Sequence, residues 1–203
     1  MLQSATPRLI LASASSARRA VLSAAGLAFD VQAAAIDEAA IKQSGQAEGA
    51  APADVAILLA ELKAERIARR NPEALVIGCD QLLVCDGIWF DKPTDPADAA
   101  RHLKHLRGRT HELITAIVCL RHGQRIWHHV ARPRLTMRDF SDTFLETYLA
   151  AEADHITACV GAYRLEGLGI HLFERIEGEH AAILGIPLLA LLGFLRQHQV
   201  LAT

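Results

Sequence analysis

The segment Ser13-Ala14-Ser15-Ser16-Ala17-Arg18 stands where a predicted strand passes into a predicted helix, and it could bind an anion. Free amides at a helix start, the hydroxyls of Ser13 and Ser15, and the Arg18 guanidinium one turn later all favour phosphate. The simpler interpretation is a serine N-cap followed by a surface arginine. The chain has no GxxxxGKS motif, which excludes a P-loop.

Asp80 is a carboxylate at the end of the apolar run Leu75-Val76-Ile77-Gly78-Cys79, which is typical of a buried strand. Open α/β sheets tend to place functional groups at this end of a strand. Burying a carboxylate without a cation or donors is costly, which favours a functional role for Asp80. A turn cap is the competing interpretation, because Asp is common in turns.

Two lysines and a second carboxylate are candidates through their predicted positions. Lys63 follows Leu62 at the edge of the apolar stripe of a predicted long helix, and this stripe consists of Val55, Leu58, Leu59, Leu62 and Ile67. Lys92 follows a predicted hairpin, which could return its ammonium group towards Asp80. Glu38 lies in a polar segment and could supply a second carboxylate. Each is ordinary when taken alone.

Two further sites carry polar groups beside predicted strands or turns. Thr110-His111 begins a strand, where His111 could act as a base or hydrogen-bond a ligand, although a half-buried structural histidine is the commoner explanation. Glu166 stands between Gly161 and Gly167. Glycine lets the backbone approach a ligand closely, so this carboxylate could point into a cleft. A plain strand and turn explains the spacing equally well.

Hydrophobic periodicity and cap signals predict a mixed α/β fold, because helices and strands alternate early and hairpins dominate the middle. We expect one compact domain over residues 1–203, with two lobes around a cleft as a variant. Residues 37–51 are expected to form a polar, Gly-containing loop that could be mobile, and 183–195 a buried strand end followed by a core helix. The predicted strands are 8–12, 29–32, 75–84, 88–90, 112–120, 124–130, 134–137 and 170–176; the predicted helices are 18–25, 52–70, 95–106, 141–151 and one from 187.

Composition narrows the class of protein. With 51% hydrophobic residues the chain is not disordered, and its net charge of -2 lacks the basic excess that nucleic-acid polymers select. The four cysteines form no CxxC pair, so reduced and mostly buried thiols are expected. No signal-like start and no run near the roughly 20 apolar residues of a membrane helix is seen, so we expect no membrane partner and a cytoplasmic protein.

Together these segments resemble the Maf family of nucleotide pyrophosphatases over almost the whole chain. Any one motif is weak, but their order and spacing are highly specific. The matching motifs are Leu11-Ala12-Ser13-x-Ser15-x-x-Arg18, Asp37-Glu38, Lys63-Ala64, Gly78-Cys79-Asp80-Gln81, Lys92-Pro93, Leu106-x-Gly108-x-Thr110-His111, Gly161-Ala162-Tyr163-Arg164-Leu165-Glu166-Gly167, Ile176-Glu177-Gly178 and Leu184-Gly185-Ile186-Pro187-Leu188.

The resemblance implies a mixed twisted sheet with flanking helices and a central cleft, akin to the inosine triphosphate pyrophosphatases. It implies hydrolysis of a nucleoside triphosphate to the monophosphate and pyrophosphate with a divalent metal, normally Mg²⁺. By the same resemblance Asp80 would activate water, Glu38 would help it hold the metal, and Arg18, Lys63 and Lys92 would bind the triphosphate. Such a reaction needs a positioned water, a metal beside the carboxylates, and cations for the leaving group.

Three positions bear on which nucleotide is used. Gln81 and Glu166 resemble the branch that hydrolyses 7-methyl-GTP, because the dTTP and UTP branch usually has Thr and Gln there. A carboxylate can accept from the guanine N1-H and amine, and it suits a cationic base. Ala17 departs from both branches, which usually have Trp or Arg, and it cannot stack on a purine. Hydrolysis of dTTP, UTP or another nucleotide, and a nucleotide-binding regulator of septum formation with little turnover, therefore stay open.

The oligomeric state is also left open by the sequence. Trp89 and Phe90 are apolar residues on a predicted hairpin. They could belong to a homodimer interface or pack in the core.

Overall fold

The computed structural model describes residues 2–202 and divides them into two units, each of which is described by itself. Unit 1 comprises residues 2–81, 115–131 and 179–202, and unit 2 comprises 82–114 and 132–178. The chain therefore passes between the units several times.

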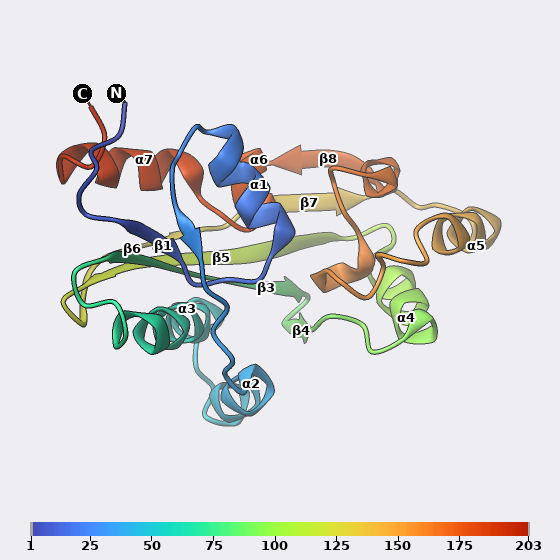
Figure 1. The fold of residues 1–203 in the computed structure, drawn as a ribbon. Helices are drawn as coiled ribbons and strands as arrows, with labels where there is room; N and C mark the ends of the chain where they lie inside the picture. The colour runs from blue at the N-terminus through green and yellow to red at the C-terminus, as the bar shows by residue number, and fades with distance from the viewer. Residues whose placement is uncertain (1, 203) are drawn as a thin grey trace. The chain divides into compact units, whose positions relative to one another are not determined.

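Unit 1 contains parallel strand pairs with helices on both faces (Figure 1). Strand β1 pairs in parallel with β2 and with β3, and the register of the second pair places Leu11 opposite Ile77. The second part of β5 forms an antiparallel hairpin with β6. The elements are β1 (Leu9–Leu11), α1 (Ser16–Ala24), β2 (Asp30–Val31), α2 (Glu38–Ala47), α3 (Pro52–Ala68), part of β3 (Leu75–Cys85), part of β5 (Thr110–Arg121), β6 (Gln124–Ala131), α6 (His180–Ile183) and α7 (Leu188–Gln197).

Unit 2 is built on antiparallel pairs. The end of β3 forms a hairpin with β4 through Asp86 and Gly87, both at positive φ. The start of β5 pairs with β7, and β7 pairs with β8. The elements are β4 (Ile88–Phe90), α4 (Pro96–Leu106), β7 (Arg134–Met137), α5 (Asp142–Ala151), the 3-10 turns η1 (Val160–Ala162) and η2 (Leu168–Leu172), and β8 (Phe173–Glu177).

The strand order is β2-β1-β3-β5-β7-β8, with β4 on β3 and β6 on β5. Parallel and antiparallel pairs occur in one sheet, so the predicted mixed α/β class is confirmed. No helix in the described residues is both long and apolar enough to cross a membrane.

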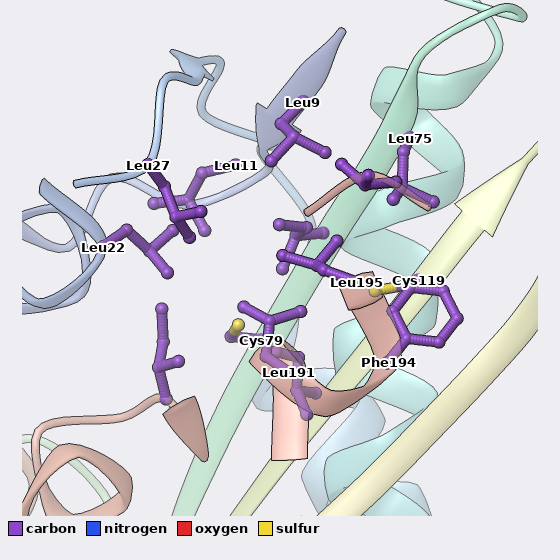
Figure 2. Close-up of a cluster of buried hydrophobic side chains, with 14 residues drawn as sticks. Leu9, Leu11, Leu22, Leu27, Leu75, Cys79, Cys119, Leu191, Phe194 and Leu195 are labelled. Atoms are coloured by element: carbon purple, nitrogen blue, oxygen red, sulfur yellow. The ribbon is translucent and has the colours of Figure 1, made fainter. Parts of the chain in front are cut away.

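The core of unit 1 fixes which way the side chains of β3 point. Figure 2 shows apolar side chains from β1, β3, α1 and α7 packed together, with Leu75 and Cys79 contributed by β3. Side chains alternate across a strand. Since Cys79 faces this core, Gly78 and Asp80 face the other side of β3, where α3 lies (Figure 1).

The local signals for helix starts and hairpins are confirmed. The side chains of Ser15, Asp95 and Ser141 each accept a hydrogen bond from the backbone N–H three residues later, as N-caps do. The two predicted hairpins form around 86–87 and 122–123. Cys79, Cys85 and Cys119 are buried free thiols, and Cys159 is half-buried, as the composition predicts.

The loop predicted over residues 37–51 is wrong, because α2 occupies most of it. Asp37 caps this helix by accepting from the Ala40 N–H at 3.0 Å, and Glu38 lies in the first turn. Gly45 looked like a loop residue, but a Cβ there would lie 2.6 Å from the Val55 side chain. The glycine therefore permits close packing of α2 against α3.

Two boundaries and one helix face also differ from the prediction. The strand expected over 170–176 begins at Phe173, after η2, and Ile183 lies in α6 instead of at a strand end. On α3, Leu58 is 46% exposed, whereas Lys63 is buried together with several alanines. The prediction weighted large apolar residues, but a helix that lies close to a strand needs small ones at the contact.

Candidate active site

Three of the candidate residues meet in an ion-pair cluster in unit 1. Lys63 Nζ lies 2.5 Å from Asp80 Oδ1 and 2.7 Å from Glu38 Oε1. Asp80 is 3% exposed and Lys63 is 7% exposed, whereas the Glu38 side chain is 43% exposed. The cluster therefore joins a buried pair to a solvent-accessible carboxylate.

Burial controls the protonation of Asp80. Desolvation raises the pKa of its carboxyl above the ordinary value of 3.8, and the Glu38 carboxylate acts in the same direction. The Lys63 ammonium and the Arg18 guanidinium oppose this rise in the pKa without cancelling it. A carboxylate with a raised pKa accepts a proton more readily, which suits a general base.

Gly78 makes the contact between Lys63 and Asp80 possible, and the sequence analysis assigned it no such role. A Cβ at Gly78 would lie 2.9 Å from the Ala64 Cβ and would also collide with the Ala60 carbonyl oxygen. Ala60 and Ala64 lie on the same face of α3 as Lys63. The missing side chain thus lets α3 lie close enough to β3 for Lys63 to reach Asp80.

Arg18 joins three chain segments of unit 1. Its Nη1 donates to Ser13 Oγ and to the Cys79 carbonyl, both at 3.1 Å, and its Nε donates to the Gly185 carbonyl at 3.0 Å. Ser15 caps α1 by accepting from the Arg18 N–H at 3.3 Å. These bonds hold the guanidinium beside the carbonyl of the residue before Asp80, and its contact with a triphosphate stays a prediction.

The donor set of the cluster fits a hard divalent cation. Asp80 Oδ2 is buried and has no hydrogen-bond partner among residues 2–202. An unsatisfied buried carboxylate oxygen is costly, and a cation would satisfy it. Carboxylate oxygens, here from Asp80 and Glu38, are the ligands that Mg²⁺ prefers.

The two specificity candidates of unit 1 have different surroundings. Gln81 Nε2 donates to Thr115 Oγ1 at 2.8 Å and to the carbonyls of Ala182 and Ile183 at 3.1 Å. Gln81 therefore ties β3 to α6. Ala17 is half-buried in the first turn of α1, where its methyl group offers no ring for stacking.

In unit 2 the structure brings Lys92 and Glu166 to the same neighbourhood. Both residues are exposed. Burial raises the pKa of the Cys159 thiol, the Glu166 carboxylate adds to the rise, and the Lys92 ammonium opposes it. The two opposite charges therefore both lie near Cys159, although they are far apart in the sequence.

Glu152 positions the segment that carries Glu166, and the sequence analysis missed it. Its carboxylate is 4% exposed and accepts from Arg164 Nε and Nη2, both at 3.0 Å. It also accepts from the Leu168 N–H at 3.4 Å. Bonds to residues on both sides of Glu166 hold that backbone in place. Arg164 belongs to the motif quoted above, but Glu152 follows α5 without a local pattern that could have revealed it.

The structure places Thr110 and His111 in side-chain contacts within unit 2. Thr110 Oγ1 lies 2.9 Å from Thr136 Oγ1, and His111 Nε2 lies 2.7 Å from the Tyr163 hydroxyl. Burial lowers the pKa of His111 to about 4, so the ring is neutral at pH 7. A direct substrate contact for either residue stays a prediction.

The mixed α/β fold carries a buried lysine–aspartate pair and a helix start with serine and arginine side chains, an arrangement compatible with an enzyme that acts on a phosphate-bearing substrate. The model of the family described as "Maf-like protein" matches residues 8–198, and the chain belongs to this family. The resemblance stated from the motifs is thereby confirmed.

Curated relatives cover nearly the whole chain. A "Nucleoside triphosphate pyrophosphatase" of Granulibacter bethesdensis is 58% identical over 194 residues, 96% of this chain and 98% of the relative. A protein of the same name from Rhodospirillum rubrum is 55% identical over 195 residues, 96% of each chain. A "7-methyl-GTP pyrophosphatase" of Rhizobium meliloti is 52% identical over 191 residues, 94% of this chain and 96% of the relative.

Proposed function

We propose that this nucleoside triphosphate pyrophosphatase acts on 7-methyl-GTP, releasing 7-methyl-GMP and pyrophosphate. The observation that carries the proposed chemistry is the buried Lys63–Asp80 pair with Glu38 at its exposed side. A binding protein for a polyanion has little use for two carboxylates beside its ligand. A hydrolase needs such a group to take a proton from water.

Asp80 is the proposed proton acceptor. The water oxygen forms a bond to the α-phosphorus, the bond from that phosphorus to the bridging oxygen breaks, and pyrophosphate leaves. The proton of the water passes to Asp80, whose raised pKa favours this transfer. Lys63 lies against the same carboxylate and keeps it oriented. The cations Arg18, Lys63 and Lys92 are proposed to stabilise charge on the triphosphate.

The proposed cofactor is Mg²⁺, held by Asp80 and Glu38. When bound it supplies positive charge that offsets the phosphates next to the two carboxylates. The support for it is the chemistry of the donors, above all the unpartnered Asp80 Oδ2. We place the activity in the cytoplasm, where free nucleoside triphosphates are found.

Glu166 is the residue proposed to recognise the methylated base. Its carboxylate is exposed, and the Glu152–Arg164 pair holds its backbone. It would accept hydrogen bonds from the base edge and offset the positive charge that N7-methylation adds. Relatives named 7-methyl-GTP pyrophosphatase at 52% and 47% identity support this substrate. Ala17 favours a weaker preference than an aromatic residue would give.

A nucleotide panel tests both parts of the proposal. The purified protein is incubated with Mg²⁺ and 7-methyl-GTP, GTP, UTP or dTTP, and the monophosphate and pyrophosphate are measured together. We expect the highest kcat/KM with 7-methyl-GTP and its loss in Asp80→Asn. Preference for UTP or dTTP would refute the proposed substrate but keep the chemistry. No turnover with any nucleotide would favour a binding regulator.

Glu166→Gln isolates the specificity step. A hydrogen bond to a charged group contributes about 1.5–3 kcal/mol, so the ratio of kcat/KM for 7-methyl-GTP to that for UTP should fall about 10- to 100-fold. Glu146→Gln removes an exposed carboxylate from α5 and serves as the matched control. An unchanged ratio in Glu166→Gln would mean that another residue recognises the base.

A further inference from the structure

Cys85, Asp86 and His105 form a cluster in unit 2 that the proposed hydrolysis does not use. Their ligand atoms, a thiol sulfur, a carboxylate oxygen and an imidazole nitrogen, all lie within 4.8 Å of one another. Cys85 ends β3, Asp86 lies in the turn to β4, and His105 lies in the last turn of α4. The hairpin and the helix thus bring together three different kinds of metal-binding side chain.

The imidazole of His105 lacks a partner for one of its nitrogens. Nε2 is buried and makes no hydrogen bond within the described residues. The ring packs against Phe90, with centroids 5.2 Å apart, so an apolar surface excludes water from one side. A buried nitrogen without a partner is costly, and a metal ion would supply the missing bond.

The Cys85 thiol is buried and only weakly bonded. Its sulfur lies 3.8 Å from the Thr110 carbonyl and 3.9 Å from Asp86 Oδ2. These are long contacts to two acceptors, and a thiol is a weak donor. The sulfur therefore loses little on binding a metal ion instead.

Asp86 can adjust to complete the cluster. Its side chain is 67% exposed, and its nearest cation is Arg109 Nε at 3.7 Å from Oδ2. An exposed ion pair of this kind is weak, so it opposes rotation of the carboxylate little. Asp86 lies in a tight turn with a backbone φ of 49°, and it directly follows Cys85 in the chain.

We propose that Cys85, Asp86 and His105 bind a borderline divalent transition metal of the Zn²⁺ type, with water as the fourth ligand. Sulfur, imidazole nitrogen and carboxylate oxygen together suit Zn²⁺ and Co²⁺, whereas Mg²⁺ prefers oxygen alone. Ligand bonds of about 2.0–2.3 Å require neighbouring ligand atoms at about 3.3–3.8 Å. Cys85 Sγ and Asp86 Oδ2 are already 3.9 Å apart and all three ligand atoms lie within 4.8 Å of one another, so a small contraction completes the site. The exposed Asp86 side chain is free to take part in that movement.

A metal ion at this cluster would connect the β3–β4 turn to the end of α4. Near this point β4 packs on α4, because the Phe90 ring contacts the rings of His102 and His105. Bonds from one ion to both elements would stabilise unit 2 against unfolding. The proposal does not depend on the nucleotide substrate.

Cobalt binding to the whole protein tests the proposal by absorption. Co²⁺ bound to a thiolate in a tetrahedral site gives intense visible d–d bands and a sulfur-to-metal charge-transfer band. Oxygen ligands at Asp80 and Glu38 cannot produce the charge-transfer band. We expect these bands at one Co²⁺ per chain, and their bleaching by Zn²⁺. They should persist in Asp80→Asn, because its side chain is not in the cluster.

Two variants and a control test the cysteine and histidine ligands. Cys85→Ser should abolish the charge-transfer band, and His105→Gln should lower Zn²⁺ affinity at least about 100-fold, because even outer partners of a metal contribute about 10- to 100-fold. His102→Gln is the matched control, since His102 lies one turn earlier in α4 and contacts the same Phe90 ring. Zn²⁺ affinity is measured by competition with a chromogenic chelator.

Asp86→Asn provides a second route if the buried Cys85 variant does not fold, because Asn tolerates the positive φ of that turn. It should weaken Zn²⁺ binding while circular dichroism remains that of the wild type. Absence of a thiolate band in the wild type would overturn the proposal. A band that survives in His105→Gln, or that is lost equally in His102→Gln, would also overturn it.

Discussion

Removing the two partners of the buried Lys63–Asp80 pair one at a time should have unequal effects on stability. Lys63→Met leaves the Asp80 carboxylate at 3% exposure without the cation bonded to it. Breaking a buried pair in this way costs about 3–5 kcal/mol, or about 6–20 °C in Tm for a chain of this length. Asp80→Asn leaves Lys63 paired with Glu38 at 2.7 Å. It should therefore cost less, about 1.5–3 kcal/mol, the value of one hydrogen bond to a charged group.

A double-mutant cycle separates this explanation from a simple loss of packing. The variant with both Lys63→Met and Asp80→Asn has no buried unpaired carboxylate at position 80, so it should be more stable than Lys63→Met alone by about 2 kcal/mol or more. The measurement is urea unfolding of the four proteins followed by circular dichroism. Equal losses in the two single variants, or additive losses in the double variant, would refute the reasoning.

The stability lost in Lys63→Met should depend on pH, and the direction of this dependence follows from the pKa of Asp80. Burial already raises the pKa of Asp80 in the wild type, and removing Lys63 removes a group that lowers it. A carboxyl group whose pKa is higher in the folded state than in the unfolded state stabilises the fold fully at pH values below the unfolded-state pKa of about 3.9. This stabilisation is lost as the pH rises through the folded-state pKa. The deficit of Lys63→Met should therefore be larger at pH 7 than in mild acid. A deficit that is independent of pH would contradict this assignment.

Two shorter predictions concern the rate and the packing around the same strand. The value of kcat/KM should fall as pH is lowered, because protonated Asp80 cannot accept a proton from water; a pH–rate profile without such an acid limb would exclude Asp80 as the base. Gly78→Ala should destabilise the protein by about 1–3 kcal/mol, since its Cβ would crowd Ala60 and Ala64. Gly193→Ala in α7 meets nothing within 4 Å and should be neutral or stabilising in the same urea unfolding assay.

Elements with strong local signals could be predicted because their causes lie within a few residues. Asp95 followed by Pro96 starts α4, and the Asp86-Gly87 pair forms the turn between β3 and β4, as the sequence indicates. Helix α2 could not be recognised in the same way. Its glycine is explained only by Val55 on the neighbouring helix, so a local rule interprets it as a loop signal.

The order of the motifs predicts the candidate residues, but it does not predict which of them contact one another. The sequence singles out Lys63 and Asp80 separately, and it places Lys63 at the edge of an apolar stripe. In the structure Lys63 is buried, because α3 lies against β3 at Gly78. Glu152 shows the same limit, since its contacts with Arg164 and Leu168 depend on how the chain returns after α5.

The sequence by itself determined the family, the α/β class and the residue types of the candidate site, since these follow from local motifs and hydrophobic periodicity. Only the tertiary structure decided that Lys63 is shared between Asp80 and Glu38, and that Cys85, Asp86 and His105 form a second cluster. The physical reason is that burial and the distances between charges depend on residues remote in the chain. Those quantities set the pKa of a carboxyl and the availability of a ligand atom.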